Sequence, residues 1–154
     1  MSVYDTLTRL KIEIPNATAP AAAYVPYVQT GNLIFVSGHI ARKNGQPWRG
    51  QLGNTMTLEE GREAARIVAI DLIGTLQAAA GDLNRIARIV SLTVLVNSGQ
   101  GFTEHHLVAN GASELMEAVF GEAGRHARAA FGVAQIPLGS CVEIMLVAEL
   151  VTAS

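Results

Sequence analysis

"HARAAFGVAQIPLGSCVEIMLVAEL", residues 126–150, is the stretch on which the interpretation of this fold depends. Two runs that alternate as β-strands do, 126–135 and 141–151, flank the turn-forming segment IPLGS. Each run carries one charged residue, Arg128 or Glu143, among small or apolar neighbours. Because a buried charge loses its hydration unless a partner replaces it, both residues are candidates for a functional site. The pattern predicts that the two runs pair as a hairpin.

Arg128 shares one face of its predicted strand with Ala130, Gly132 and Ala134. Such small side chains would leave open space beside the guanidinium group. Its parallel N–H donors would suit a small carboxylate ligand there. A structural salt bridge to a neighbouring residue is the alternative, and the strand pattern alone favours neither interpretation.

Glu143 lies on a strand face that is otherwise largely apolar. A carboxylate in such surroundings tends to have a raised pKa and can hold or activate a water molecule. Equally, Glu143 could simply pair with Arg128 or another cation. In a hairpin centred near 137–138, Glu143 would pair near Gly132. The two charges would then be separated by about 13 Å of backbone, enough for a small molecule.

The rest of the chain divides into segments with recognisable patterns. Residues 2–10 predict a short amphipathic helix, and 15–23 predict an extended connector. Two β-type runs, 24–29 and 33–40, are separated by a Gly-Asn pair that is typical of hairpins. The stretch 42–54 contains three glycines and a proline, which predicts a loop.

Two helices and one more strand follow. Thr57 and Glu60 match a capping box, and Gly81 lies where a helix beginning there would end. Residues 88–98 predict a strand with Val90, Leu92, Val94 and Val96 on one face, and about 103–120 predict a second helix. The order β, β, α, β, α, β, β indicates an α+β fold, a mixed sheet with two helices on one face. We expect a single domain over 1–154, in which 1–19 form an N-terminal helix and connector.

Composition limits the classes of function. The chain is 49% hydrophobic and 16% charged, so the surplus apolar surface predicts a subunit interface. Its net charge of −2, with the basic residues scattered, argues against nucleic-acid binding. The single cysteine, Cys141, allows no internal disulfide bond and no cysteine-based zinc site. We expect a soluble cytoplasmic protein, because neither a signal-peptide pattern nor an apolar run near 18 residues is present.

Other candidates for chemistry are weaker. His105 and His106 are adjacent and would point about 100° apart on a helix, so they cannot share a metal ion. His39 could act as a base, although histidines in such turns more often cap or pack. The glycines of 42–54 match no phosphate-binding loop. We therefore expect no metal and no cofactor.

Two segments taken together, TGNLIFVSGHI (30–40) and HARAAFGVAQIPLGSCVEI (126–144), resemble the Rid family of reactive-intermediate deaminases. This family is also described as YjgF-like or L-PSP endoribonuclease-like and has a chorismate-mutase-like fold. The resemblance rests on the G-N-x-x-x-x-S-G turn, the A-R pair and the V-E-I motif, and it extends over about 20–150. It implies a homotrimer with three clefts between subunits, each of which holds a small carboxylate.

The resemblance also implies roles for particular residues. Arg128 would grip the carboxylate of the ligand, and Glu143 would position water. Main-chain groups at Gly38 and Ala130 would help to hold the ligand. A tyrosine would pack over it, and this is Tyr24 by an ungapped count or Tyr27 by its P-Y context.

The chain departs from the family pattern in ways that indicate a divergent subgroup. Ala130 stands where cysteine is frequent, which excludes thiol chemistry at that position, and His39 stands where glutamine is frequent. The asparagine expected in the second helix is displaced. Ser113 occupies its place, and Asn110 lies one turn earlier.

For function, the resemblance implies a deaminase that hydrolyses enamines or imines of 2-amino acids to 2-keto acids and ammonia, with no cofactor. The alternative is a non-catalytic trimer that binds a keto acid and regulates a partner. Endoribonuclease activity, which the family name mentions, is disfavoured by the low basic charge. An isomerase like chorismate mutase would rest on fold analogy alone.

Overall fold

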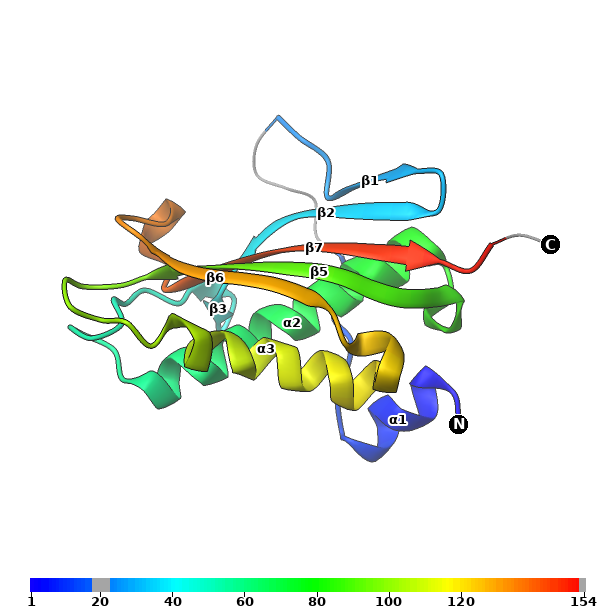
Figure 1. Ribbon diagram of the computed structural model, residues 1–154, viewed down its shortest axis with the longest axis horizontal. Helices are drawn as coiled ribbons and strands as arrows, with labels where there is room; N and C mark the ends of the chain where they lie inside the picture. The colour runs from blue at the N-terminus through cyan, green and yellow to red at the C-terminus, as the bar shows by residue number, and fades with distance from the viewer. Residues whose placement is uncertain (18–22, 153–154) are drawn as a thin grey trace.

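The computed structural model describes residues 1–17 and 23–152. Its centre is a five-stranded sheet in the order β1-β2-β7-β5-β6, in which only the β5–β6 pair is parallel (Figure 1). This confirms the α+β class and the mixed sheet. The strands are β1 (Tyr27–Thr30), β2 (Leu33–Ile40), β5 (Ile86–Asn97), β6 (Ala127–Val133) and β7 (Val142–Leu150).

The predicted hairpin between the last two runs is wrong. β6 pairs in parallel with β5, whereas β7 lies between β2 and β5 and is antiparallel to both. The connection between β6 and β7 contains the short 3₁₀ turn η3 (Pro137–Gly139) and passes across the sheet instead of folding back. Alternation shows which face of a strand is buried but does not identify the neighbouring strand, so the 13 Å separation drawn from the hairpin is wrong as well.

Two long helices cover one face of the sheet, as predicted (Figure 1). α2 (Leu58–Ala80) begins at Thr57, which forms the expected capping box with Glu60, and it ends at Gly81 with φ 76°. α3 (His105–Phe120) buries Val108, Ala112, Leu115 and Val119 and is followed by the 3₁₀ turn η2 (Gly121–Gly124). α2 packs mainly on β2 and β7, and α3 packs on β5 and β6.

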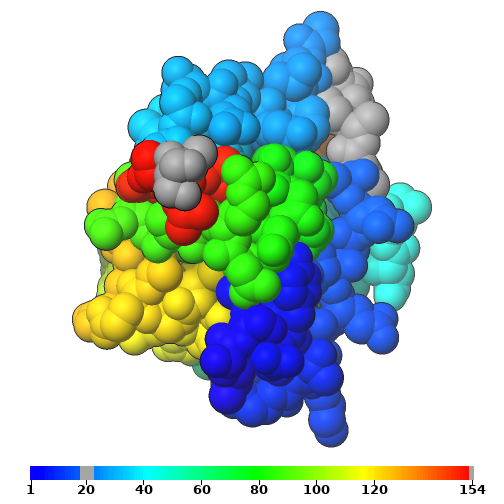
Figure 2. Space-filling view, turned by 90° about the vertical axis from the view of Figure 1, so that its right-hand side faces the viewer, coloured from blue at the N-terminus to red at the C-terminus, as the bar shows by residue number. Residues whose placement is uncertain are grey.

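The N-terminal helix α1 (Val3–Arg9) is also confirmed, and Ser2 caps it. The Tyr4 hydroxyl accepts a hydrogen bond from the Leu83 amide at 2.9 Å and donates one to Gln77 Oε1 at 2.6 Å. These bonds hold α1 against the end of α2 and the 3₁₀ turn η1 (Leu83–Arg85). Figure 2 shows the blue N-terminal residues beside this green region. Most of the predicted connector, 18–22, lies outside the described residues.

The structure corrects two further expectations. A register shift between Ile89 and Ser91 of β5 places Ile89 in the core, so Val90, which is only partly buried, does not continue the buried face of Leu92. Within 42–54, two short strands, β3 (Arg42–Lys43) and β4 (Gln46–Pro47), form a small hairpin where only a loop was expected.

The second face of the sheet carries an exposed apolar patch formed by Val28, Phe35, Phe131 and Met145. Their side chains are between 41% and 54% exposed, and no described helix covers them. An apolar patch of this kind on a sheet is characteristic of an interface. No helix formed by residues 1–17 and 23–152 is long and apolar enough to cross a membrane.

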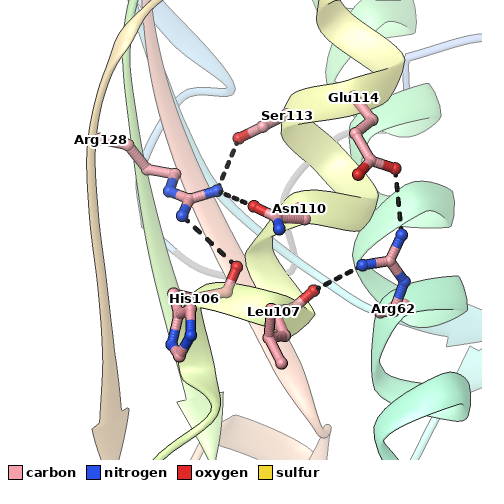
Figure 3. Close-up of polar contacts among 7 residues, drawn as sticks. All are labelled: Arg62, His106, Leu107, Asn110, Ser113, Glu114 and Arg128. Atoms are coloured by element: carbon pink, nitrogen blue, oxygen red, sulfur yellow. Dashed lines mark hydrogen bonds and ion pairs between the residues drawn. The ribbon is translucent and has the colours of Figure 1, made fainter.

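The two covering helices lie close together at Gly111 of α3. A Cβ atom at this position would collide with the main-chain carbonyl oxygen of Arg62 in α2. The Arg62 side chain then reaches across and donates hydrogen bonds to Leu107 O at 3.3 Å and Glu114 Oε2 at 3.0 Å (Figure 3). The helix pair that supports the sheet therefore depends on glycine at position 111.

We predict that Gly111→Ala destabilises the fold, because the collision is with backbone and can be relieved only by moving a helix. Overpacking of this kind costs about 1–3 kcal/mol. The free energy of unfolding in urea measures it. Gly99→Ala is the matched control, since a Cβ at Gly99 would meet only ordinary contacts at 3.5–3.6 Å. Equal stability of the two variants would contradict this account of the helix pair.

Candidate active site

Arg128 extends from β6 toward α3 and is held there by neutral oxygen atoms (Figure 3). Its Nη1 donates to Asn110 Oδ1 at 2.8 Å and to Ser113 Oγ at 3.1 Å, and Nη2 donates to His106 O at 3.4 Å. Among the described residues, no carboxylate forms an ion pair with Arg128. The geometry therefore does not support the alternative that Arg128 forms a structural salt bridge.

The donors that remain on Arg128 define an edge for a ligand. A guanidinium group has five N–H donors, and the two on Nη1 are both used. Only one of the two on Nη2 is engaged, by the long contact to His106, and no partner is present for Nε within residues 1–17 and 23–152. The Nε–Nη2 edge is therefore available for the two oxygens of a carboxylate.

A cavity of about 310 Å³ adjoins this arginine. Most of the residues that line it are polar or charged, and they come from one face of α3 and from the segment that leads into β6: Asn110, Ser113, Glu114, Glu117, Gly124, Arg125, His126 and Arg128. The open space expected on the small-residue face of β6 is occupied by α3 near Ala130 and Gly132. A Cβ at Gly132 would collide with His105 Nε2 of α3 and with Ser98 Oγ. The free volume thus lies at the edge of the sheet rather than above it.

Glu143 lies on the opposite face of the sheet, against Gly38 of β2. The register of β2 with β7 shifts between Val36 and His39, so that Ser37 and Gly38 together form a bulge. A Cβ atom on Gly38 would collide with Glu143 Oε2, so only glycine permits the carboxylate to lie there. Burial raises the pKa of Glu143, and nearby His39 partly opposes the shift.

His39 is held on the helix side of the sheet. Its Nδ1 lies 2.7 Å from Ser37 O, and its Nε2 lies 2.8 Å from Thr75 Oγ1 of α2. A carbonyl oxygen can only accept, so Nδ1 carries a proton and a neutral ring accepts the Thr75 hydroxyl proton at Nε2. Both ring nitrogens are occupied, which fits a packing role for His39 better than that of a free base.

Arg128 and Glu143 point to opposite faces of the sheet. Arg128 is level with Leu92 of β5 and Leu146 of β7, both buried under the helices. Glu143 is level with Leu95 of β5, two strands away from the exposed Phe131 on the uncovered face. Side chains alternate along a strand, so within one chain these two charges cannot reach the same small ligand.

The pairing of β1 with β2 distinguishes between the two tyrosine candidates. Tyr27 is level with Val36 and packs against the hydrophobic core, on the side that the helices cover. Tyr24 precedes the strand and is 53% exposed. The adjoining Val25 carbonyl accepts a hydrogen bond of 2.6 Å from Ser37 Oγ, which ties this segment to the bulge at Gly38. Tyr24 therefore lies near Gly38 with an exposed ring.

The sequence-predicted site residues thus form two groups. Tyr24, Gly38 and Glu143 belong to the β1–β2–β7 side, whereas Arg128 and Ala130 belong to β6 at the opposite edge of the sheet. Cys141 is outside both groups and fully buried, and burial raises the pKa of its thiol to about 12, so it stays protonated at neutral pH.

A model of the family described as "YjgF/chorismate_mutase-like, putative endoribonuclease" matches residues 5–150. The chain belongs to this family. Protein TCP17 of Trypanosoma cruzi is 50% identical over 150 residues, which are 96% of this chain and 94% of that protein.

Solved structures agree with this assignment. Atu1372 of Agrobacterium tumefaciens, a protein of unknown function, is similar with a TM-score of 0.88 and 37% identity, over 97% of this chain and 94% of its own. RidA from the Antarctic bacterium Psychrobacter is similar with a TM-score of 0.58 and 29% identity, over 90% of this chain and 98% of its own. The resemblance to Rid proteins is confirmed at the level of the family.

The sequence placed Ser113 and Asn110 in the second helix but did not indicate that they contact Arg128, and it did not single out His126. The sequence nevertheless contains a signal for each of them. Asn110 and Ser113 are spaced i, i+3 outside the apolar stripe of α3, so they share a polar helix face. His126 precedes Arg128 by two residues, the period that places side chains on one face of a strand.

We predict that Glu143→Gln stabilises the fold at neutral pH. A raised pKa means that the folded chain binds the proton more tightly than the unfolded chain does. Wild type therefore loses stability as pH rises from the ordinary pKa of glutamate through the raised pKa of Glu143 in the folded chain, whereas Glu143→Gln does not. The gain should disappear below about pH 4, where glutamate is protonated in both states. Thermal melts from about pH 3 to pH 8 check this. A variant that is less stable than wild type at pH 7 would mean that the carboxylate holds the fold.

Proposed function

We propose that the protein is a hydrolytic deaminase of enamine or imine intermediates of 2-amino acids, releasing 2-keto acids and ammonia. The observation that carries the proposal is the state of Arg128, a guanidinium oriented by three neutral oxygens and left with an unpaired edge beside a polar cavity. An arginine in this state matches the carboxylate that all 2-imino acids share.

Glu143 supplies the second element of the proposal. It is half-buried, its pKa is raised by burial, and within the described part of the chain it forms no ion pair. Retaining such a charge costs stability, and groups of this kind are concentrated at functional sites. A carboxyl group with a raised pKa can both accept a proton from water and return one, which is what imine hydrolysis requires.

The proposed reaction needs one water molecule and one proton carrier. Arg128 holds the substrate carboxylate through its Nε–Nη2 edge. Glu143 takes a proton from water as the water oxygen bonds to the imine carbon, and it passes that proton to the nitrogen. In the resulting carbinolamine, Glu143 takes the proton of the hydroxyl group and delivers it to the amino nitrogen. The carbon–nitrogen bond then breaks, ammonia leaves, and the carbon–oxygen double bond of the keto acid forms. Holding the two reactants together accounts for much of the acceleration.

Because Arg128 and Glu143 of one chain point to opposite faces of the sheet, we propose that each site is completed by two copies in a homotrimer. Arg128 and the Ala130 main chain would come from one copy, and Glu143, Gly38 and Tyr24 from its neighbour. The exposed apolar patch (Val28, Phe35, Phe131 and Met145) supports such an assembly, because it would be buried between copies.

The expected assembly in solution is a trimer, and multi-angle light scattering at micromolar concentration measures it. Phe35→Glu places a charge in the apolar patch and should shift the mass toward that of a single chain. A wild-type protein that stays monomeric across this range would rule out the shared site.

The deaminase activity is tested by ammonia release from a freshly generated 2-imino acid. We expect Glu143→Gln to lower the rate by about 10²-fold or more while ligand affinity is retained. Arg128→Lys keeps the charge but loses the paired donors, so it should weaken carboxylate binding by roughly 10- to 100-fold.

Two outcomes would contradict this assignment. Turnover that is unchanged in Glu143→Gln would remove the water-placing role. A wild type that binds 2-keto acids but releases no ammonia would identify a carboxylate-binding regulatory protein instead.

A further inference from the structure

We propose that Ser113 and His126 are positioning residues for Arg128, forming a relay that fixes which edge of its guanidinium group faces the ligand. The inference rests on the proposed carboxylate-binding role of Arg128 and adds two residues to it. Each link is a short contact: Arg128 Nη1 to Ser113 Oγ at 3.1 Å, Ser113 Oγ to His126 Nε2 at 2.8 Å, and His126 Nδ1 to Gly124 O at 2.6 Å.

The direction of every hydrogen bond in this relay follows from chemistry. The Gly124 carbonyl can only accept, so Nδ1 of His126 carries the proton. The Nε2 of a neutral ring is then an acceptor, and the Ser113 hydroxyl must donate to it. With its own proton committed, the Ser113 oxygen presents only lone pairs to Arg128, whose guanidinium can only donate. His126 therefore fixes the orientation of the Ser113 hydroxyl, whose lone pairs face Arg128.

This acceptor completes the restraint on Nη1. Asn110 Oδ1 takes one Nη1 proton and Ser113 Oγ takes the other, so that end of the guanidinium plane is fixed at two points on α3. Without Ser113, one Nη1 proton is free and the plane is held only by Asn110 and by the long contact of Nη2 to His106 O. The Nε–Nη2 edge would then no longer be held toward a ligand, and ordering it on binding would cost affinity.

The charges around the relay explain why neutral groups suit this role. In the same cavity, Glu114 is paired with Arg62 at 3.0 Å and Arg125 with Glu122 at 3.7 Å. A carboxylate in place of Ser113 would also hold Arg128, but it would compete with the carboxylate of the ligand. A hydroxyl oriented by a neutral imidazole fixes the guanidinium and leaves its positive charge for the ligand.

The molecule contains a second serine–histidine pair that serves as a matched control. Ser98 Oγ and His105 Nε2 are 3.0 Å apart at the start of α3, against Gly132, and neither contacts Arg128. Removing the Ser98 hydroxyl deletes a bond of the same kind without touching the relay. A general effect of losing a serine–histidine bond is thereby separated from an effect on Arg128.

The experiment measures pyruvate affinity by calorimetry for wild type, Ser113→Ala, His126→Ala, the double variant and Ser98→Ala. We expect Ser113→Ala and His126→Ala each to weaken binding by about 3- to 10-fold, the range for one lost hydrogen bond. If His126 acts through Ser113, the double variant binds no more weakly than Ser113→Ala alone. Ser98→Ala should bind as wild type does. In turnover assays the relay variants should raise KM more than they lower kcat.

Additive losses in the double variant, or an equal loss in Ser98→Ala, would overturn the relay. A second readout does not need a ligand: the side-chain N–H resonances of Arg128 in protein carrying ¹⁵N-labelled arginine. Restricted Nη1 protons should give resolved signals in wild type and Ser98→Ala and should broaden in both relay variants. If wild type binds no 2-keto acid, the proposed function fails, yet these spectra still decide the relay. Unchanged spectra in Ser113→Ala would refute it.

Discussion

Side-chain alternation in the central sheet is the constraint on which this account of the molecule depends. β5 separates β6 from β7, and the pairing registers place Arg128 on the face that the helices cover and Glu143 on the uncovered face. In the proposed site, one chain consequently carries two incomplete halves, with Arg128 on the edge strand β6 and Glu143 on the central strand β7. The same uncovered face carries the exposed apolar patch, so assembly would bury the patch and complete the site in a single step.

Each half holds its charge in a way that stability alone does not favour. Glu143 is half-buried without a cationic partner among the described residues, and it fits only because position 38 is glycine. Arg128 is restrained by Asn110, Ser113 and the His106 carbonyl, all of them neutral. A fold selected only for stability would pair or remove a half-buried carboxylate such as Glu143, whereas the proposed site for a small anionic substrate uses both charges.

Much of the fold was predictable from local chemistry, because caps and turns are specified by a few neighbouring residues. The capping box at Thr57, the helix end at Gly81 and the turn at 31–32 were all predicted correctly. Strand partners were not predictable in this way. The alternation around Arg128 and Glu143 identified strands but not their neighbours, so a hairpin was expected where β6 and β7 are separated. Likewise, only the pairing of Tyr27 with Val36 distinguishes the packed tyrosine from the exposed Tyr24.

The most direct test of the shared site is complementation between two impaired variants. Arg128→Lys and Glu143→Gln chains, co-expressed in equal amounts, form mixed assemblies in which some sites combine an intact arginine from one copy with an intact glutamate from its neighbour. Random mixing in a trimer would restore about one quarter of the wild-type deaminase activity. Activity no greater than the average of the two separate variants, in assemblies shown to be mixed, would contradict a site built from two copies.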